Sequence, residues 1–577
     1  MIDKTKLSTE LNLSLSVPYA ERENALGLNE GFYPVEDEWE LIIRYFGMLD
    51  EINEEVAFSY IELFNGYAII RIKQENIDAL SNNPQIIFIE KPKEVYFESD
   101  FEAGNMDSLA YVSLMPAGYN ISCFNLLNYG INDYEGEGVL IAVIDTGINY
   151  LHPVFLNNDN KTEIYEIWDQ NLPGNPPFNL KIGSIYEKED IDMLIADNNK
   201  NIAFDSSGHG TAVAGIIKRL APKAKLLIVK LRENFESSFS RTTSIMLGIT
   251  YAIKKSMELS LPLVINLSFG NNYGDHDSGA ILERYIDSVA DISKISIVTG
   301  TGNEGATSRH TEFNIMEKSW YQEEFFVSRF ERSINIQIWR KFSDVIDIFL
   351  VTPSGAELGP FNNYQETMRF IVNDMNIFVL NGVPSPININ QETFISIIPN
   401  DSFINEGVWK IKFNPKSIFD GRVNVWLPVA ASTSSELKFI RPKEFTTLTI
   451  PGTARRAVTV GAYNQNNLNY AAFSGRGYSV SGDIKPDIVA PGVDINTAAL
   501  DGGTTFVSGT SFAAPFVSSA AALLMEYGIT DGNDLFLYGE KLKSYLIKGA
   551  KKLPGANVIP NERIGWGALC VADSFPV

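Results

Sequence analysis

The sequence predicts an α/β protein with a parallel-sheet core, a small α+β unit before it and an all-β module inserted into it. Between residues 135 and 305, short and almost wholly apolar runs alternate with helical patterns, which is typical of a parallel sheet buried on both faces. Between residues 306 and 445 the helical periodicity disappears, and apolar runs are separated by Pro, Gly, Asn and Asp. This pattern indicates a β-sandwich or jelly-roll-like module. Because the α/β pattern returns after Phe445, the β module is predicted to be an insertion.

The first hundred residues predict the small α+β unit. An Asn65-Gly66 turn joins two alternating apolar runs, and Asn-Gly between such runs is a strong hairpin signal. The expected strands cover residues 41–45, 58–63, 67–72 and 86–90, with a short helix over 74–80.

The elements of the core and of the β module follow from the same patterns. In the core, strands are expected over 139–144, 226–229, 263–267, 295–298 and 457–461, and helices over 211–220, 244–259 and 511–527. In the β module, strands are expected over 334–339, 346–351, 377–380 and 408–413.

Composition and charge exclude several classes of protein. The chain has 577 residues, of which 71 are acidic and 47 basic, and its formal net charge is −24. This balance argues against sequence-independent binding to nucleic acid or to anionic membranes. No apolar stretch reaches the roughly 18 residues of a transmembrane helix, and the first thirty residues lack the apolar segment of a secretory signal. The two cysteines, Cys123 and Cys570, lie far apart, so we expect no disulfide framework, and either a reducing compartment or no redox role for the cysteines.

Polar side chains gather where the predicted strands end and the next helices begin. In an open parallel sheet, functional groups collect just beyond the carboxyl ends of the strands. The segments at these places are Asp145-Thr146-Gly147, Gly208-His209-Gly210, Ser268-Phe269-Gly270, Gly300-Thr301-Gly302-Asn303 and Gly509-Thr510-Ser511. One cleft is therefore expected to hold an acid, a histidine, an amide and a serine.

Only one of the four histidines has surroundings typical of a catalytic group. His209 is flanked by glycines at the start of a helix, which lets the backbone approach closely and leaves the imidazole accessible. The other three precede a proline or lie in polar, irregular stretches: His152, His276 and His310. Taken alone, Asp145 also fits a turn aspartate and Ser511 a helix N-cap. The set of three indicates a catalytic triad.

Residues 300–305 also spell the glycine pattern of a dinucleotide-binding loop, GTGNEG. That fingerprint needs a helix that opens at the third glycine, and residues 306–315 are polar and irregular instead. The sequence carries no zinc, calcium-loop or Walker signature. We therefore expect no cofactor and no catalytic metal.

The motifs resemble those of the subtilisin-like serine proteases, the subtilases, in which the triad has the chain order Asp, His, Ser. Similar to the family's three active-site motifs are Asp145-Thr146-Gly147, Gly208-His209-Gly210-Thr211 and Gly509-Thr510-Ser511-Phe512-Ala513-Ala514-Pro515. Ser268-Phe269-Gly270 resembles the strand that pairs with substrate, and Asn303 resembles the oxyanion-hole asparagine. Gly300, Thr301 and Gly302 stand with Ser268–Gly270 at the walls of the family's substrate-binding pocket.

The resemblance implies a serine endopeptidase. Ser511 would attack the scissile carbonyl, His209 would take its proton and pass it to the leaving amine, and Asp145 would orient the imidazole. The side chain of Asn303 and the backbone N–H of Ser511 would bind the oxyanion. Structural calcium is frequent in this family, but the sequence gives no position for it.

The N-terminal unit resembles the family's prodomains, which assist folding and occupy the cleft until they are cleaved. Residues 64–67 and 88–91 stand where such prodomains have their hairpin and final strand, so the junction is expected a few residues beyond Phe97. The expected domains are a prodomain at 1–98, a catalytic core at 99–305 and 446–577, and the β module at 306–445. A permanent structural domain is the alternative for the N-terminal unit.

The β insertion, the missing secretory signal and Ile167-Trp168-Asp169-Gln170 resemble the Csp-type proteases of spore-forming clostridia. In that subgroup the prodomain stays associated, and the active member activates the zymogen of a cortex-lytic enzyme during spore germination. The resemblance implies a protein substrate, related pseudoproteases as partners, and a place in the mother-cell cytoplasm or the spore. Two alternatives stay open: a generic intracellular degradative subtilisin, and a pseudoprotease-like sensor silenced by its retained prodomain.

Overall fold

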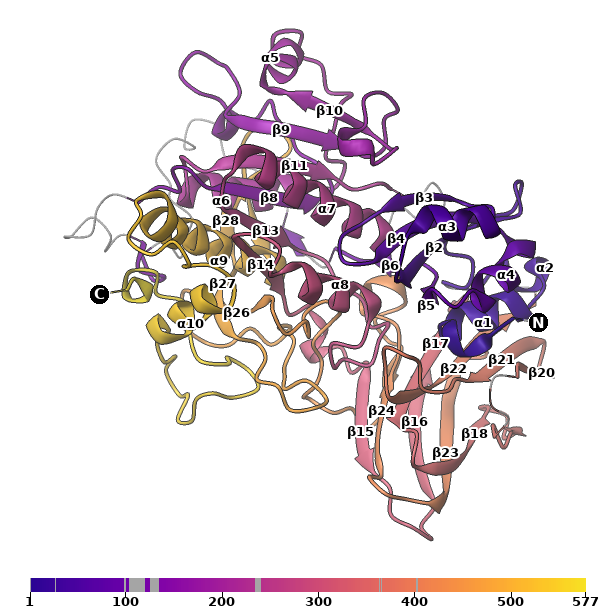
Figure 1. The fold of residues 1–577 in the computed structure, drawn as a ribbon. Coiled ribbons are helices and arrows are strands. Elements are labelled where there is room, and N and C mark those ends of the chain that lie inside the picture. The colour runs from indigo at the N-terminus through magenta and orange to yellow at the C-terminus, as the bar shows by residue number, and fades with distance from the viewer. Residues whose placement is uncertain are drawn as a thin grey trace.

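The computed structural model describes residues 2–25, 27–97, 100–102, 120–124, 134–233, 240–362, 364, 366–400 and 403–576. Its core is an eight-stranded sheet with the order β10-β9-β11-β8-β13-β14-β26-β27 (Figure 1). Every neighbouring pair is parallel except β10 and β9. The strands are β8 (Leu140–Asp145), β9 (Ile164–Asp169), β10 (Ser184–Glu187), β11 (Lys225–Lys230), β13 (Leu263–Leu267), β14 (Ile295–Gly300), β26 (Val458–Asn464) and β27 (Ile488–Val493). The predicted parallel-sheet core is confirmed.

Helices cover both faces of this sheet, which explains why its strands are apolar without alternation. On one face, α6 (His209–Leu220) and α9 (Thr510–Met525) pack against residues such as Ile141 and Val143 of β8. On the other, α7 (Thr242–Leu259) and α8 (Ile281–Val289) pack against Leu140, Ala142 and Ile144. Two further helices, α5 (Lys188–Ala196) and α10 (Gly539–Gly549), flank the core.

The N-terminal unit is a five-stranded antiparallel sheet with helices. Its elements are α1 (Thr9–Ser16), α2 (Tyr19–Arg22), β1 (Phe32–Tyr33), β2 (Glu38–Tyr45), α3 (Leu49–Glu55), β3 (Ser59–Glu62), β4 (Tyr67–Lys73), α4 (Ile77–Asn82) and β5 (Ile86–Glu90). One face of β2 packs in the unit's own core through Leu41 and Ile43. The other face of the sheet packs on α7 and α8 through Ile42 of β2 and Tyr67 of β4. The hairpin at Asn65-Gly66 and the α+β class are as predicted, whereas α1, α2, α3 and β1 were not predicted.

Residues 310–439 form two antiparallel sheets that enclose a separate apolar core. One sheet contains β15 (His310–Asn314), β24 (Arg422–Trp426), β17 (Ile334–Lys341), β22 (Asn390–Pro399), β21 (Met375–Asn381) and β20 (Met368–Val372). The other contains β19 (Glu357–Leu358), β18 (Val345–Val351), β23 (Gly407–Ser417), β16 (Tyr321–Val327) and β25 (Lys438–Phe439). The chain leaves the core after β14 and returns at β26, which are neighbours in the core sheet. The module lies beside the N-terminal unit (Figure 1), with α1 packed on β21 and β22. The exact boundaries at 98, 305 and 445 stay predictions.

The two cysteines form a disulfide, so the expectation of no disulfide was wrong. The Cα atoms of Cys123 and Cys570 are 4.9 Å apart, although 447 residues separate them in the chain. The fold brings them together because residues 120–124 pack on the C-terminal segment, where Val571 donates a backbone hydrogen bond to Ser122 at 3.0 Å. Distance along a sequence does not limit such pairing, and the argument from two distant cysteines to a reducing compartment does not hold.

One helical segment in the described part of the chain, Thr510–Thr530, is long and apolar enough to cross a membrane by composition alone. However, 94% of its most apolar window is buried inside the protein. It contains α9, the central helix of the core, whose residues are buried on all sides. Its apolar character is therefore explained by packing between the sheet and α6.

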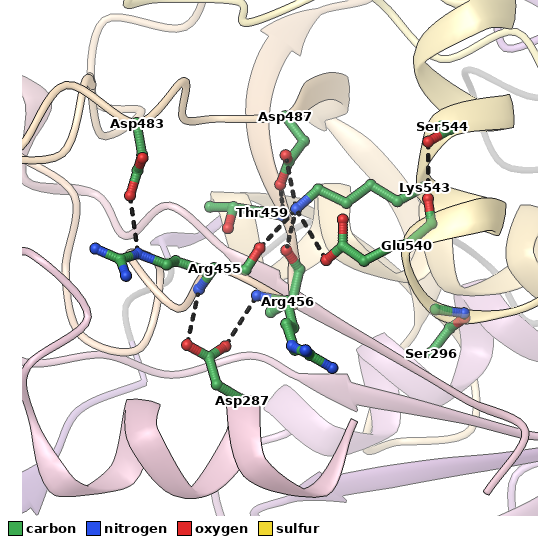
Figure 2. A network of polar contacts seen from close by, with 12 residues as sticks. Asp287, Ser296, Arg455, Arg456, Thr459, Asp483, Asp487, Glu540, Lys543 and Ser544 are labelled. Atoms are coloured by element: carbon green, nitrogen blue, oxygen red, sulfur yellow. Dashed lines mark hydrogen bonds and ion pairs between the residues drawn. The ribbon is translucent and has the colours of Figure 1, made fainter. Parts of the chain in front are cut away.

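A buried polar network ties the amino ends of β26 and β27 to α10 (Figure 2). Asp487, just before β27, lies 2.8 Å from the ammonium group of Lys485 and 3.1 Å from that of Lys543. It also accepts a hydrogen bond from Thr459 N at 2.7 Å. Burial lowers the pKa of Lys485 to about 8. Burial alone would raise the pKa of Asp487, but the two ammonium groups lower it below its ordinary value.

We expect Asp487→Ala to lower the free energy of unfolding by about 3–5 kcal/mol, because two buried lysines would lose their counter-charge. Scanning calorimetry measures this as a fall in the melting temperature. The matched control is Asp483→Ala, which breaks the exposed Arg455–Asp483 pair in the same region and should cost less than about 1 kcal/mol. Equal effects of the two substitutions would contradict this account of the network.

Candidate active site

The site lies at the carboxyl edge of the three central strands. In register, Ile144 of β8 is paired with Leu267 of β13, and Leu267 with Thr299 of β14. The residues that follow these strands therefore emerge side by side. The helices α6 and α9 begin at the same edge, with His209 as the first residue of α6 and Ser511 as the second of α9.

Asp145 and His209 form a buried hydrogen-bonded pair. Nδ1 of His209 lies 2.7 Å from Oδ1 of Asp145, and both residues are fully buried. The close approach of α6 requires a glycine at position 210, because a Cβ there would lie 2.3 Å from the carbonyl oxygen of Gly147. Nε2 of His209 makes no hydrogen bond to the described residues. Asp145 thus fixes the imidazole through Nδ1, and Nε2 remains as the nitrogen that can accept a proton.

Ser511 is fixed by reciprocal hydrogen bonds with Ser268. Its Oγ donates to the carbonyl oxygen of Ser268 at 3.2 Å, and Ser268 Oγ donates to the carbonyl oxygen of Ser511 at 3.1 Å. Asn266 donates to Ser268 Oγ at 2.9 Å and accepts from Ser518 Oγ at 2.8 Å. The next residue, Phe512, places its ring 5.3 Å from that of His209. A buried polar chain therefore links β13 to the start of α9.

Asn303 follows β14 and is oriented by the residue before Ser511. Its Oδ1 accepts hydrogen bonds from Thr510 N at 3.1 Å and from Thr510 Oγ1 at 3.2 Å. With its oxygen bonded to Thr510, the Asn303 side chain can act as a donor through its amide nitrogen. The first N–H groups of α9 have no partner within the helix, and they carry the positive end of its dipole.

The predicted substrate-binding residues lie at the carboxyl ends of β13 and β14. Gly270 and Gly302 both lie against Thr449, where a Cβ on either glycine would come within 2.3 Å of Thr449 Oγ1. Thr301 accepts a hydrogen bond from Thr449 N at 3.0 Å, and Gly300 packs on Thr510. Thr449 therefore contacts both predicted walls of the substrate-binding pocket, the one at Gly270 and the one at Thr301 and Gly302.

The N-terminal unit places its last described residues in this site. Tyr96 and Gly270 exchange two backbone hydrogen bonds, each of 3.0 Å, as in an antiparallel strand pair. The ring of Phe97 lies 5.2 Å from that of His209 and 6.2 Å from that of Phe269. An extended peptide therefore already occupies the strand predicted to pair with substrate.

The chain also pairs with the strand that leads into Ser511. Residues Asp100–Glu102 (β7) run antiparallel to Thr504–Ser508 (β29), which also pairs with Ile495–Ala498 (β28). Residue 100 is in register with Ser508. The predicted junction at residues 98 and 99 lies outside the described residues, and it is bracketed by these two pairings.

Two comparisons with family models identify the chain. The model described as "Subtilase family" matches residues 136–370 and 414–567. The chain belongs to the subtilase family. A second model, described as "Csp protease B prodomain", matches residues 5–93.

Known structures and sequences resemble this subtilase to different extents. The structure of the Clostridium perfringens CspB protease has a TM-score of 0.73 and 32% identity, and the match covers 79% of this chain and 96% of that one. The PIII-type proteinase of Lactococcus lactis subsp. cremoris is 23% identical over 86% of this chain. This chain spans only 26% of that proteinase's length. Subtilisin E of Bacillus subtilis is 24% identical over 249 residues, which cover 42% of this chain and 50% of subtilisin E. The chain therefore combines a subtilase domain with an N-terminal unit that matches the Csp protease B prodomain.

Several residues of this subtilase site were missed from the sequence. Asn266 stands out as one polar residue in a buried apolar strand, and Ser518 as a serine inside an apolar helix. Such exceptions in a buried run are a signal that sequence analysis can use. Thr449 carries no local signal, because it meets the glycines only through the tertiary fold. In the described residues, no group of three or more His, Cys, Asp or Glu side chains is placed to hold a metal ion. The expectation of no catalytic metal stays a prediction.

We expect Asn303→Ala to slow peptide-bond hydrolysis by about 10²–10³-fold, the magnitude known for such a donor in subtilisin. The reason is that the side-chain amide, oriented by its hydrogen bonds with Thr510, would bind the developing negative charge in the predicted oxyanion hole. The rate is measured as the conversion of the full-length chain to fragments, with Asn557→Ala on the exposed surface as the control. An unchanged rate in Asn303→Ala would remove Asn303 from the oxyanion hole.

Proposed function

We propose that the protein is a self-processing serine endopeptidase that uses Asp145, His209 and Ser511 as its triad. The observation that carries this proposal is the position of its own prodomain tail. Tyr96 pairs with the predicted substrate strand at Gly270, and Phe97 packs on His209. A peptide bound in this way presents the bonds just beyond Phe97 to Ser511.

The proposed reaction uses only groups of this chain. Ser511 Oγ attacks the carbonyl carbon of the scissile bond while His209 Nε2 accepts its proton, and the imidazolium returns that proton to the leaving amine. Asp145 accepts the Nδ1–H bond, which fixes the tautomer and stabilises the imidazolium. The Asn303 amide and the N–H of Ser511 bind the oxyanion. Water then hydrolyses the acyl-enzyme.

Buried charges support a prodomain that stays bound after cleavage. The ammonium group of Lys93 lies 3.6 Å from Glu10 and 3.8 Å from Glu90, and it donates to the carbonyl oxygen of Tyr273 in the core at 3.1 Å. Although burial opposes it, the two carboxylates raise the pKa of Lys93. Glu10 and Glu90 belong to the prodomain itself, so dissociation would break the bond to Tyr273 and two bonds to α7. These two join Lys93 N to Thr242 Oγ1 at 3.1 Å and Thr242 N to the carbonyl oxygen of Lys93 at 2.9 Å.

The β module adds an apolar contact to the same prodomain. Leu13, Val17, Ala25 and Leu28 of the N-terminal unit form one buried cluster with Phe378, Leu380, Phe394 and Ile398 of the module. Burying such side chains stabilises an interface by about 25 cal/mol per Å² of apolar surface. The prodomain thus packs against both the module and the core, which favours its retention after cleavage.

The finer role follows from the resemblance to Csp-type proteases. We propose that limited proteolysis by this enzyme activates a protein zymogen, a spore cortex-lytic enzyme, during germination. The match to the Csp protease B prodomain and the inserted β module support this role. The proposed location is the mother-cell cytoplasm or the spore, and the proposed partners are that zymogen and related pseudoproteases.

The test of the proposed function is the intact mass of the purified wild-type chain beside that of Ser511→Ala. We expect two fragments from the wild type, split just beyond Phe97, and a whole chain from the variant. We also expect the two wild-type fragments to elute together in gel filtration, because the buried contacts of Lys93 and the apolar cluster stay intact.

Other outcomes select the alternatives. Whole chains in both samples would favour a silent, pseudoprotease-like sensor. Fragments in both samples would mean that another protease makes the cut. Cleavage followed by separation of the fragments, with broad hydrolysis of unrelated proteins, would favour a degradative subtilisin.

A further inference from the structure

A buried aspartate outside the proposed triad organises the loop that carries His209. Asp205 is fully buried, and no lysine or arginine of the described residues forms an ion pair with it. Its Oδ1 accepts hydrogen bonds from Thr146 Oγ1 at 2.8 Å, Gly208 N at 2.9 Å, Ser207 Oγ at 3.1 Å and Ser207 N at 3.2 Å. Its Oδ2 accepts from Thr211 N and Thr211 Oγ1, both at 2.8 Å. These donors stabilise the carboxylate without a counter-charge.

Through Thr146, this carboxylate determines how Asp145 is bonded. The Thr146 hydroxyl has a single hydrogen, and its shorter contact is with Asp205 at 2.8 Å rather than with Asp145 at 3.2 Å. The same hydroxyl oxygen accepts from Gly210 N at 3.0 Å. Oδ1 of Asp145 is then left to Thr146 N and to His209 Nδ1, each at 2.7 Å.

On the other side, Asp205 fixes the first turn of α6. It accepts hydrogen bonds from the backbone N–H groups of Gly208 and Thr211. Gly208 immediately precedes His209, and Thr211 follows it by two residues. N–H groups at a helix start have no partner inside the helix, and a carboxylate there satisfies them and favours the dipole. Ser207, itself bound to Asp205, accepts from His209 N at 3.1 Å. The residues on both sides of His209 are thus hydrogen-bonded to the carboxylate of Asp205, and the N–H of His209 is bonded to it indirectly through Ser207.

Asp205 is itself held in place. Lys230 donates to the carbonyl oxygen of Phe204 at 2.6 Å, and Ala203 N donates to Asp169 at 2.9 Å. Ile148 N donates to the carbonyl oxygen of Ala203 at 3.0 Å. The two residues before Asp205 are therefore hydrogen-bonded to β9 and β11, which fixes the aspartate relative to the core sheet.

We propose that Asp205 is a positioning residue of the peptidase reaction, which fixes the position of the Asp145 carboxylate relative to the His209 imidazole. It acts through Thr146 on one partner and through the first turn of α6 on the other, and it does not touch the substrate. The inference rests on the proposed triad. A loss of register of about 1 Å in such a site costs on the order of 10²-fold in rate.

The experiment measures the first-order rate of self-cleavage after cell-free synthesis of Asp205→Asn, Thr146→Val and the double variant, with the rate of Ser511 labelling by a fluorophosphonate as a second readout. The matched control is Asp344→Asn in the β module. Asp344 is 1% exposed and likewise accepts several backbone N–H groups, from Phe419, Asp420 and Gly421. Melting temperatures of all variants are recorded.

We expect Asp205→Asn to slow both readouts by about 10- to 100-fold, while Asp344→Asn loses similar melting temperature and keeps the wild-type rates. Thr146→Val should slow them less, and the double variant should be no slower than Asp205→Asn, because both changes break the same link. A merely structural role predicts instead that rates follow melting temperature and that the two effects multiply.

The outcomes separate this inference from the proposed function. Wild-type rates in Asp205→Asn, or multiplied effects in the double variant, overturn the positioning role and leave the triad standing. If Asp205→Asn does not fold, a wild-type rate in Thr146→Val overturns it. If the wild type itself neither cleaves nor reacts with the fluorophosphonate, the proposed function and this inference both fail.

Discussion

The in-register parallel pairing of β8, β13 and β14 is the constraint on which the rest of the structure depends. It aligns the carboxyl ends of three buried strands, so that Asp145, Ser268 and the loop to Asn303 emerge at one edge. The helices α6 and α9 start at that edge and bring His209 and Ser511 to it. The apolar character of α9, buried between the sheet and α6, follows from this arrangement rather than from any membrane.

The other two units are organised around the edge that the core provides. The prodomain buries both faces of its sheet, one in its own core and one on α7 and α8, and extends its tail along Gly270. The β module is inserted between β14 and β26, which are adjacent strands of the core sheet. Its strands β21 and β22 pack against α1 of the prodomain. The disulfide between Cys123 and Cys570 ties the segment beyond the prodomain to the C-terminus.

The sequence predicts the architecture well because its strongest signals are local. Apolar runs, the Asn65-Gly66 hairpin and the glycines around His209 each report a backbone requirement at their own position. The features it missed depend on contacts between distant segments: the Cys123–Cys570 pairing, Thr449 beneath two glycines, and the bonds of Asp205 with Thr146. The helix α1 was missed because its apolar residues face another unit as well as its own, which obscures the amphipathic pattern.

The prodomain tail is proposed to be bound in the cleft of its own chain and to be cut there. The most direct test is the rate of self-cleavage over about two orders of magnitude in chain concentration, since a preformed intramolecular complex reacts at a rate independent of concentration. Tagged Ser511→Ala chain is added as a possible substrate in trans. If the tail is cut within its own chain, the half-time stays constant and the Ser511→Ala chain stays uncut. A rate that rises with concentration, with cleavage of the added variant, would contradict it.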